Sequence, residues 1–369
     1  MKSVLVLSAL AMLALSACGK STDTASVESA ADMPSEPESV AQVDDAAAAL
    51  NALYAEFDDE FLRDNPVFAT FRGDMRFNDQ WFPDDILSDE YLEKAYQRDR
   101  SYLERIKAID PGGLSEADRS NYEIFKLDRE LAIERHELGL NHMQLLTPVS
   151  QFFSVPNFLV LLGSGANAQP FRTAEDYDNW IKRSSGFVDH VDLSIARMRE
   201  GIESGIVQPR ILMQKTLPQL DAQIVESAEQ SAFWQPIKGM PEDFSEADRE
   251  RLTEAYRTHI QEVLVPAYAK LRDFIRDEYM PETRETIGQG DVPGGEDLYR
   301  WLVRETTTTG YTPEEIHEIG KQEAERISAE IEKVRELVGF EGDMQPVSYS
   351  HLTLPTTSAL CRSRWSPYH

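Results

Sequence analysis

Apolar residues recur every three or four positions through most of the chain, which is the spacing of one face of an α-helix. In the segment 45–65 this spacing sets Leu50, Leu53, Phe57 and Phe61 on one side of a helix. No segment shows the alternation typical of a strand, and no pair of segments carries a hairpin signal. The pattern predicts an all-α fold with a multi-helix, elongated body over residues 45–343. Further helices are expected over 87–109 and 115–146, and after Thr173, Pro209, Ser245 and Thr312.

Several of these helices begin with residues that are typical of helix starts. Ser115 and Ser245 each open the same five-residue sequence with Asp in the third helical position, which predicts a capping box. Thr312 precedes Pro and two Glu residues, a strong start signal for a helix that Gly339 would close. Five repeated residues are too few to indicate a structural repeat.

The segment 148–171 contains no Asp, Glu, Lys or Arg and is rich in Phe, Leu and Val. We interpret it as the core over which the charged helices pack. Its uncharged polar residues Gln151, Ser154 and Asn157 keep a ligand pocket as the alternative. Gln151 and Asn157 are therefore candidate substrate contacts.

Charge and cysteine content narrow the range of functions. The chain has 65 acidic and 37 basic residues and a formal net charge of -28. Such a charge repels phosphate backbones, so we expect no nucleic-acid partner. The two cysteines, Cys18 and Cys361, lie near the ends of the chain, so no disulfide framework is expected.

The first residues have the features of an export signal. Met1 and Lys2 precede a short apolar run that ends in Leu-Ser-Ala before Cys18. This ending resembles the bacterial lipobox, so residues 1–17 are predicted to be a lipoprotein signal peptide and Cys18 the lipidated residue. The alternative is an ordinary cleaved signal peptide. Gly19 favours the outer membrane, by resemblance to Gram-negative lipoproteins, with the protein facing the periplasm. Residues 18–44 are expected to form a flexible acidic tether.

Two histidine pairs invite comparison with metal sites. His136 and Glu137 are followed by His142, whereas a zinc-binding helix needs its second His four residues after the first. On a continuous helix, six residues turn through about 600°, so these two imidazoles would face different ways. His317 has Lys321 where a second ligand would stand. We therefore expect surface histidines and no metal ligand in this chain.

No catalytic residue can be assigned from motifs. The chain lacks the G-x-S-x-G nucleophile pattern, and the glycines at 163–165 lack the Lys and Ser or Thr of a phosphate-binding loop. Arg210 follows a turn and could bind a substrate carboxylate. A structural ion pair is the favoured alternative for Arg210.

The last 26 residues differ from the rest of the chain. No Asp or Glu follows Asp343, and the helical period stops. Residues 347–356 resemble one reading frame of the transposon mosaic-end adapter used in sequencing libraries, from which only Ser350 departs. We expect 344–369 to be a foreign or disordered tail.

From about Ala46 to Asp343 the sequence resembles the bacterial envelope family called domain of unknown function 885. The resemblance rests on four stretches, residues 65–79, 151–180, 198–220 and 302–320. It implies a mostly helical lipoprotein of nearly twice this length, related to zinc metallopeptidases. In such relatives two His and a later Glu would hold zinc, and the first Glu would activate water. Those positions have no counterpart in this chain.

Two functional hypotheses follow. The chain would be the N-terminal portion of an outer-membrane-anchored, zinc-peptidase-like protein, inactive alone, with Gln151, Asn157 and Arg210 as possible peptide contacts. Alternatively, it would be a non-catalytic envelope lipoprotein that binds a peptide or scaffolds a partner.

Overall fold

The structure is a computed structural model that describes residues 38–83, 86–152 and 154–342, with side chains from residue 45. The predicted signal peptide, Cys18, most of the predicted tether and the segment 344–369 lie outside the described residues. Within them every regular element is helical, apart from one isolated bridge between Pro209 and Arg284. The all-α prediction is confirmed. The chain divides into two compact units, residues 1–301 and 302–369.

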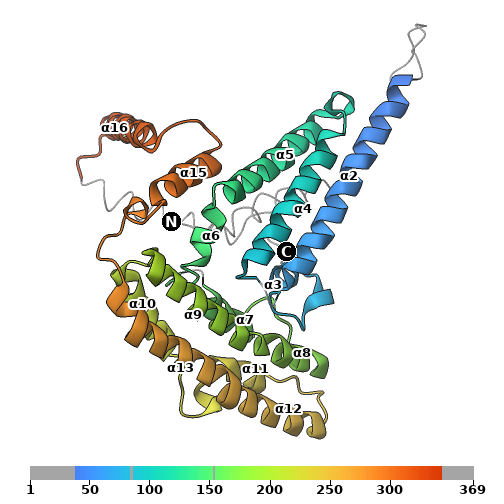
Figure 1. Cartoon of the computed structure of the whole chain (residues 1–369), viewed down its shortest axis with the longest axis vertical. Coiled ribbons are helices and arrows are strands. Elements are labelled where there is room, and N and C mark those ends of the chain that lie inside the picture. The colour runs from blue at the N-terminus through green and yellow to red at the C-terminus, as the bar shows by residue number, and fades with distance from the viewer. Residues whose placement is uncertain (1–37, 84–85, 153, 343–369) are drawn as a thin grey trace. The chain divides into compact units, whose positions relative to one another are not determined.

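Three long helices of the first unit share a small hydrophobic core. They are α2 (Glu38–Asp64), α4 (Asp89–Lys107) and α5 (Glu116–Glu137), which lie side by side in Figure 1, and we call them the three-helix bundle. Their aromatic residues pack edge to face, with the Phe57 ring 5.0 Å from those of Tyr102 and Phe125. The buried residues are Leu50, Leu53, Phe57, Tyr102, Ile106, Leu114, Tyr122 and Phe125.

A second, larger core is built by the helices that follow, which we call the main body. These are α7 (Val155–Gly163), α8 (Ala174–Ser185), α9 (Phe187–Ser204), α10 (Arg210–Asp221), α11 (Gln235–Lys238), α12 (Glu246–His259), α13 (Val265–Phe274) and α14 (Met280–Glu282). Two short helices join the bundle to it, α3 (Pro66–Phe71) and α6 (Leu140–Leu145).

The uncharged segment 148–171 does contribute to the core of the main body. Leu159 and Leu162 of α7 are fully buried. A Cβ at Gly163 would lie 2.3 Å from the Trp180 ring and 2.6 Å from Phe233, so only glycine allows these aromatic rings to approach. The core interpretation of this segment is confirmed for the inner face of α7.

The predicted helix starts are found, with one difference in detail. Thr312 and Glu315 form a full capping box at α16 (Pro313–Leu337). Ser115 caps α5 by accepting from the Asp118 N–H at 3.1 Å, but the Asp118 carboxylate accepts from the serine hydroxyl instead of a backbone N–H. Ser245 repeats this arrangement with the same distances. The caps are therefore confirmed, while the second half of the box is absent from these two serine starts.

Three helix boundaries differ from the sequence prediction. The expected helix 115–146 is broken, because Gly139 adopts a left-handed φ of 68° and ends α5 before α6 begins. The helix expected after Thr173 is divided at Gly186, against which Trp81 packs so closely that a Cβ would lie 2.8 Å away. Helix α2 begins at Glu38, within the residues expected to form the tether.

The long helical stretch from Ser245 contains two π-helical segments, Ile260–Leu264 and Ile275–Tyr279. Each lies directly before the turn that contains a proline, Pro266 and Pro281. Proline has no N–H and its ring clashes with the carbonyl four residues earlier. The wider π turn accommodates both features, so the helix continues instead of stopping.

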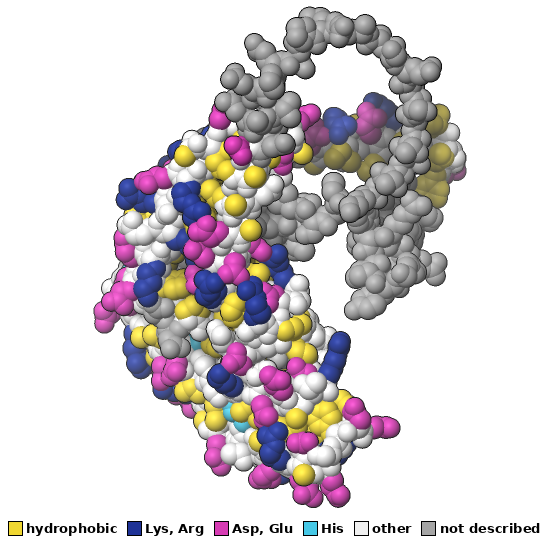
Figure 2. Space-filling view, turned by 90° about the vertical axis from the view of Figure 1, so that its right-hand side faces the viewer, with side chains coloured by type: hydrophobic (Ala, Val, Ile, Leu, Met, Phe, Trp, Pro, Cys, Tyr) yellow, Lys and Arg dark blue, Asp and Glu magenta, His cyan; other side chains and the backbone are white. Residues whose placement is uncertain are grey.

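Helix α15 (Gly295–Thr307) crosses from the first unit into the second, and α16 is the last described helix. No residue of α16 is buried, although apolar side chains recur along it. No described helix is both long and apolar enough to cross a membrane. Figure 2 shows acidic and basic side chains intermingled over the face that it presents.

Candidate functional site

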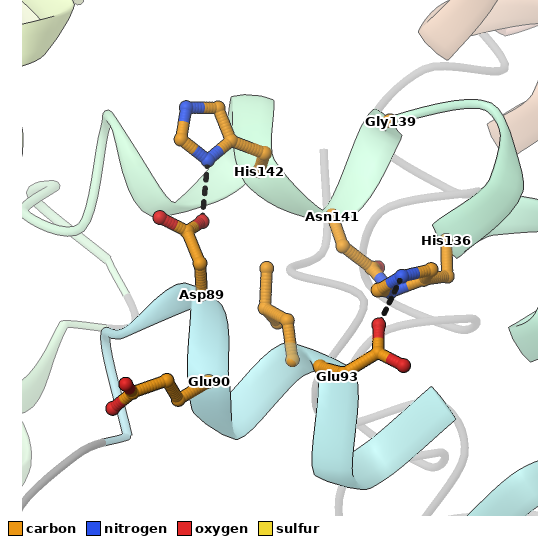
Figure 3. A pocket seen from close by; sticks show the side chains of 8 residues that line it. Asp89, Glu90, Glu93, His136, Gly139, Asn141 and His142 are labelled. Carbon is orange, nitrogen blue, oxygen red and sulfur yellow. Dashed lines mark hydrogen bonds and ion pairs between the residues drawn. The ribbon is translucent and has the colours of Figure 1, made fainter. Parts of the chain in front are cut away.

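A hollow of about 490 Å³ lies where α4, α5 and α6 meet, and we call it the α4–α6 pocket (Figure 3). Helix α4 supplies four side chains from its first two turns, and the segment 136–142 supplies the other wall. The lining residues are Asp89, Glu90, Leu92, Glu93, His136, Gly139, Asn141 and His142.

Local sequence explains why these groups converge. Ser88 caps α4 by accepting from the Tyr91 N–H at 3.0 Å, so Asp89 and Glu90 occupy the first turn. Carboxylates are favoured there because the helix dipole is positive at that end. On the opposite wall, the left-handed turn at Gly139 redirects the chain and brings His142 to the same pocket as His136.

His142 lies between two carboxylates. Its Nδ1 is 2.8 Å from Asp89 Oδ1, and its Nε2 is 2.9 Å from Glu200 Oε1 on α9. Arg197 reaches the same two carboxylates, with Nη2 3.2 Å from Asp89 and Nη1 2.6 Å from Glu200. The hydrogen bond with His142, followed by the contact with Arg197, lowers the pKa of Asp89.

His136 occupies the other end of the pocket. Its ring stacks on Tyr96 with centroids 4.3 Å apart, and its Nε2 lies 3.4 Å from Glu93 Oε2. The Tyr96 hydroxyl donates to Glu137 Oε1 at 3.0 Å. The Glu137 carboxylate is thus held by a tyrosine on α4.

The zinc implied for the relatives does not fit this pocket. Both nitrogens of His142 face carboxylates, and Glu137 is bound to Tyr96. Among the residues that the structure describes, no group of three or more His, Cys, Asp or Glu side chains is arranged to hold a metal ion. We therefore derive no metal-dependent step for these residues.

The sequence predicts that His136 and His142 are surface residues on one helix. The structure corrects this, because the break at Gly139 puts both histidines in one partly buried pocket, with the His136 side chain only 22% exposed. Gly139 was the sequence signal that could have predicted the helix end, because glycine is common where a helix ends in a left-handed residue. The partners Asp89 and Glu200 left no local signal, since they lie more than fifty positions from His142.

The candidate substrate contacts Gln151 and Asn157 are brought together. The Asn157 amide donates to Gln219 Oε1 at 3.1 Å and to the Gln151 carbonyl at 3.3 Å. The Gln219 amide donates to that same carbonyl at 3.1 Å. These bonds hold the turn that precedes α7. A role for either residue in binding substrate stays a prediction.

The third candidate, Arg210, is the first residue of α10, the helix that carries Gln219 near its other end. Its Nε lies 2.5 Å from Glu285 Oε1, which is the structural ion pair named as the alternative. Among the described side chains, no hydrogen bond joins Arg210 to Gln151 or Asn157. A substrate role for Arg210 also stays a prediction.

The main body contains a buried serine–histidine contact that no motif in the sequence indicates. Ser184 Oγ lies 2.7 Å from His259 Nε2, and the same hydroxyl donates to the Trp180 carbonyl at 2.7 Å. With its proton directed at that carbonyl, the hydroxyl accepts from the imidazole. Burial lowers the pKa of His259 to about 4. The contact is therefore a core hydrogen bond of a neutral histidine, with no activated nucleophile.

Fold and pocket define an all-helical protein with two cores in its first unit and an acidic, histidine-containing pocket at their junction. The chain belongs to the family described as "Bacterial protein of unknown function (DUF885)", whose model matches residues 66–356. The matched range includes the first part of the segment 344–369. The predicted boundary at residue 343 therefore stays a prediction.

One solved structure shows the same fold. It is described as "the putative lipoprotein from Colwellia psychrerythraea", with a TM-score of 0.62 and 17% sequence identity. The match covers 81% of this chain and 52% of that chain, so this chain spans about half the length of the solved protein. No curated protein matches the sequence.

Proposed function

We propose that this chain is the N-terminal helical part of a lipid-anchored envelope protein whose further part carries a zinc-dependent peptidase site. The observation that carries the proposal is the match in fold to about half of a longer protein described as a lipoprotein. The relation to zinc metallopeptidases, which the sequence resemblance implies for the longer members of the family, supports the peptidase class. On this proposal zinc belongs to the longer protein and the described residues of this chain do not hold it.

The chain would then build one wall of a substrate cleft. Gln151, Asn157 and Arg210 are the proposed contacts, and a peptide is the proposed substrate class. Backbone groups of a peptide suit the amide side chains, and a terminal carboxylate suits the guanidinium. The net charge of -28 makes a nucleic-acid substrate unfavourable.

Attachment to the outer membrane, on its periplasmic side, is the second element of the proposal. It rests on Cys18 and Gly19 in the sequence, with residues 18–44 as the spacer. Labelling cells with a radioactive or clickable palmitate should mark the wild-type protein and leave the Cys18→Ala variant unmarked. Equal labelling of both proteins would rule out Cys18 as the anchor.

A second candidate function is a non-catalytic lipoprotein that binds a peptide or scaffolds a partner. Helix α16 favours it, because 25 residues form a helix without burying one side chain. Ile327, Ile331 and Val334 recur on it at three- and four-residue spacing and are each about half exposed. An amphipathic helix whose apolar side stays half exposed among the described residues is typical of an interaction surface.

Metal analysis separates the two candidates. The longer protein, of which this chain would be the N-terminal part, should bind about one zinc per chain, lose thermal stability with a chelator and cleave peptides. The 369-residue chain should do none of these. If the longer protein is indifferent to zinc and chelator, the peptidase proposal fails and the scaffold is favoured.

A further inference from the structure

The joint between the three-helix bundle and the main body centres on one imidazole. His142 lies on α6, Asp89 begins α4 of the bundle, and Glu200 lies on α9 of the main body. Figure 3 shows Asp89 and His142 directed toward each other across the pocket. The two ring nitrogens of His142 lie 2.8 Å and 2.9 Å from these carboxylates, so one side chain connects three elements.

The number of protons on the ring decides whether both contacts are favourable. An ionised carboxylate only accepts hydrogen bonds, and a neutral imidazole has one N–H and one lone pair. The arrangement around His142 therefore needs two N–H groups, which only the imidazolium form has. After loss of one proton, a lone pair of the ring would face a carboxylate oxygen.

Charge balance leads to the same conclusion. His142 and Arg197 supply two positive charges, and Asp89 and Glu200 supply two negative ones. The other titratable groups of the pocket are Glu90 and Glu93 on α4 and His136 on α5. Loss of the ring proton would leave an excess carboxylate beside two further acidic residues. The lowered pKa of Asp89 keeps that carboxylate ionised in the range where histidine titrates.

We propose that Asp89, His142 and Glu200 form a pH-dependent clasp, which is closed while the ring carries two protons and loses one contact when it carries one. Arg197 is the part of the joint that does not titrate, because a guanidinium stays protonated throughout this pH range. It also donates to the Leu87 carbonyl at 2.6 Å. Release therefore loosens α6 and the wall of the pocket, while α4 and α9 stay connected. The clasp makes the shape of the pocket depend on the protonation state of the His142 ring.

Hydrogen–deuterium exchange of the full 369-residue chain tests the clasp. Between about pH 5.5 and 8.5, exchange of the segment 138–147, corrected for its intrinsic pH dependence, should become roughly fivefold faster in the wild type. His142→Gln should exchange fast at every pH, because it cannot carry the charge. His317→Gln, which changes an exposed histidine of α16, should behave as the wild type.

Glu200→Gln distinguishes the clasp from simple packing. An amide at position 200 can donate to a neutral ring nitrogen, so protection of 138–147 should remain and its pH dependence should shrink at least twofold. If the contact between Glu200 and His142 only packed the joint, Glu200→Gln would lose protection of 138–147 and would keep the pH dependence of the wild type.

Two results would overturn the clasp. One is a flat corrected exchange rate across this range in the wild type, and the other is an unchanged pH dependence in His142→Gln. If the variants do not fold, ring ¹⁵N shifts of His142 in the wild type give the answer. Both nitrogens should be protonated at pH 5.5 and only one at pH 8.5, and a single tautomer throughout would exclude the proposal.

Discussion

The three-helix bundle and the main body bury polar groups in opposite ways. In the bundle, Arg129 pairs with Asp99 at 2.5 Å, and both side chains are almost covered. In the main body, Arg183 and His190 are buried, and neither forms an ion pair with a carboxylate of the described residues. A matched ion pair and an isolated buried group respond differently to substitution and to pH, so the two regions should fail under different conditions.

Arg183 illustrates how an isolated cation is tolerated. Its guanidinium donates to three backbone carbonyls and one side-chain amide of the segments that precede α8, and burial lowers its pKa to about 10. The bonds join it to Phe77 O at 2.6 Å, Gln80 O at 2.7 Å, Gln169 Oε1 at 2.7 Å and Pro66 O at 3.2 Å. One side chain thereby fastens the connection between α2 and α4 to the main body.

The largest expected effect comes from removing this group. Arg183→Met leaves four acceptors without this donor, two of them in buried and two in part-buried contacts, and we expect the free energy of unfolding to fall by about 3–5 kcal/mol. Urea unfolding followed by tryptophan fluorescence reports it, because Trp81, Trp180 and Trp234 all lie in the core of the main body. Arg251→Met removes an exposed pair with Asp178 and should cost less than about 1 kcal/mol. Equal losses in both variants would contradict the role given to Arg183.

The stability lost by breaking the Arg129–Asp99 ion pair of the bundle should be partly restored by a second substitution. Arg129→Met leaves the Asp99 carboxylate buried and should cost about 3 kcal/mol at pH 7. Burial already raises the pKa of Asp99, so this cost should shrink at pH 4, where the carboxyl group takes up a proton. The double variant with Asp99→Leu should recover at least half of the loss. Urea unfolding followed by circular dichroism measures the loss of helix, and a double variant no more stable than the single one would contradict this interpretation.

The main body should weaken in acid because of its histidines. Burial lowers the pKa of both His190 and His259 to about 4, against about 6.5 in the unfolded chain. Their contribution is complete above pH 6.5 and is lost as pH falls toward 4, by up to about 1.4 kcal/mol per pH unit for each histidine. His259→Gln should reduce the slope of unfolding free energy between pH 7 and 5, while His317→Gln should leave it unchanged. An unchanged slope in His259→Gln would show that folding does not lower the pKa of this histidine.

The smallest effect is expected at the surface pair of Arg210. Arg210→Ala and Glu285→Gln should each cost less than about 1 kcal/mol, because both side chains reach solvent. If Arg210 also binds a substrate carboxylate, Arg210→Ala should weaken peptide binding by the longer protein and Glu285→Gln should not. Equal binding by both variants would show that Arg210 serves only in its ion pair with Glu285.

Local signals predicted most of the helices but few of the contacts. The Ser115, Ser245 and Thr312 starts are readable because a cap and the N–H that it binds lie three residues apart. The break at Gly139 was missed because a single glycine is tolerated inside many helices. This break affects the candidate site, because it determines where His142 points.

Contacts between distant residues could not be predicted in this way. His142 meets Asp89 and Glu200, and Arg183 meets Pro66, across more than fifty positions in each case. Periodicity says which side of a helix is apolar, but it does not say which helix lies opposite. The α4–α6 pocket is built from such contacts, so it appears only in the structure.

The central claim is that the chain is part of a longer family member. A long read across the codons for residues 345–356 in the source genome tests it most directly. We expect the frame to continue past Pro346 into a helix with His-Glu and a second His. A genome that encodes residues 347–369 as they stand and then stops would contradict it, and the binding or scaffold function would replace the peptidase proposal.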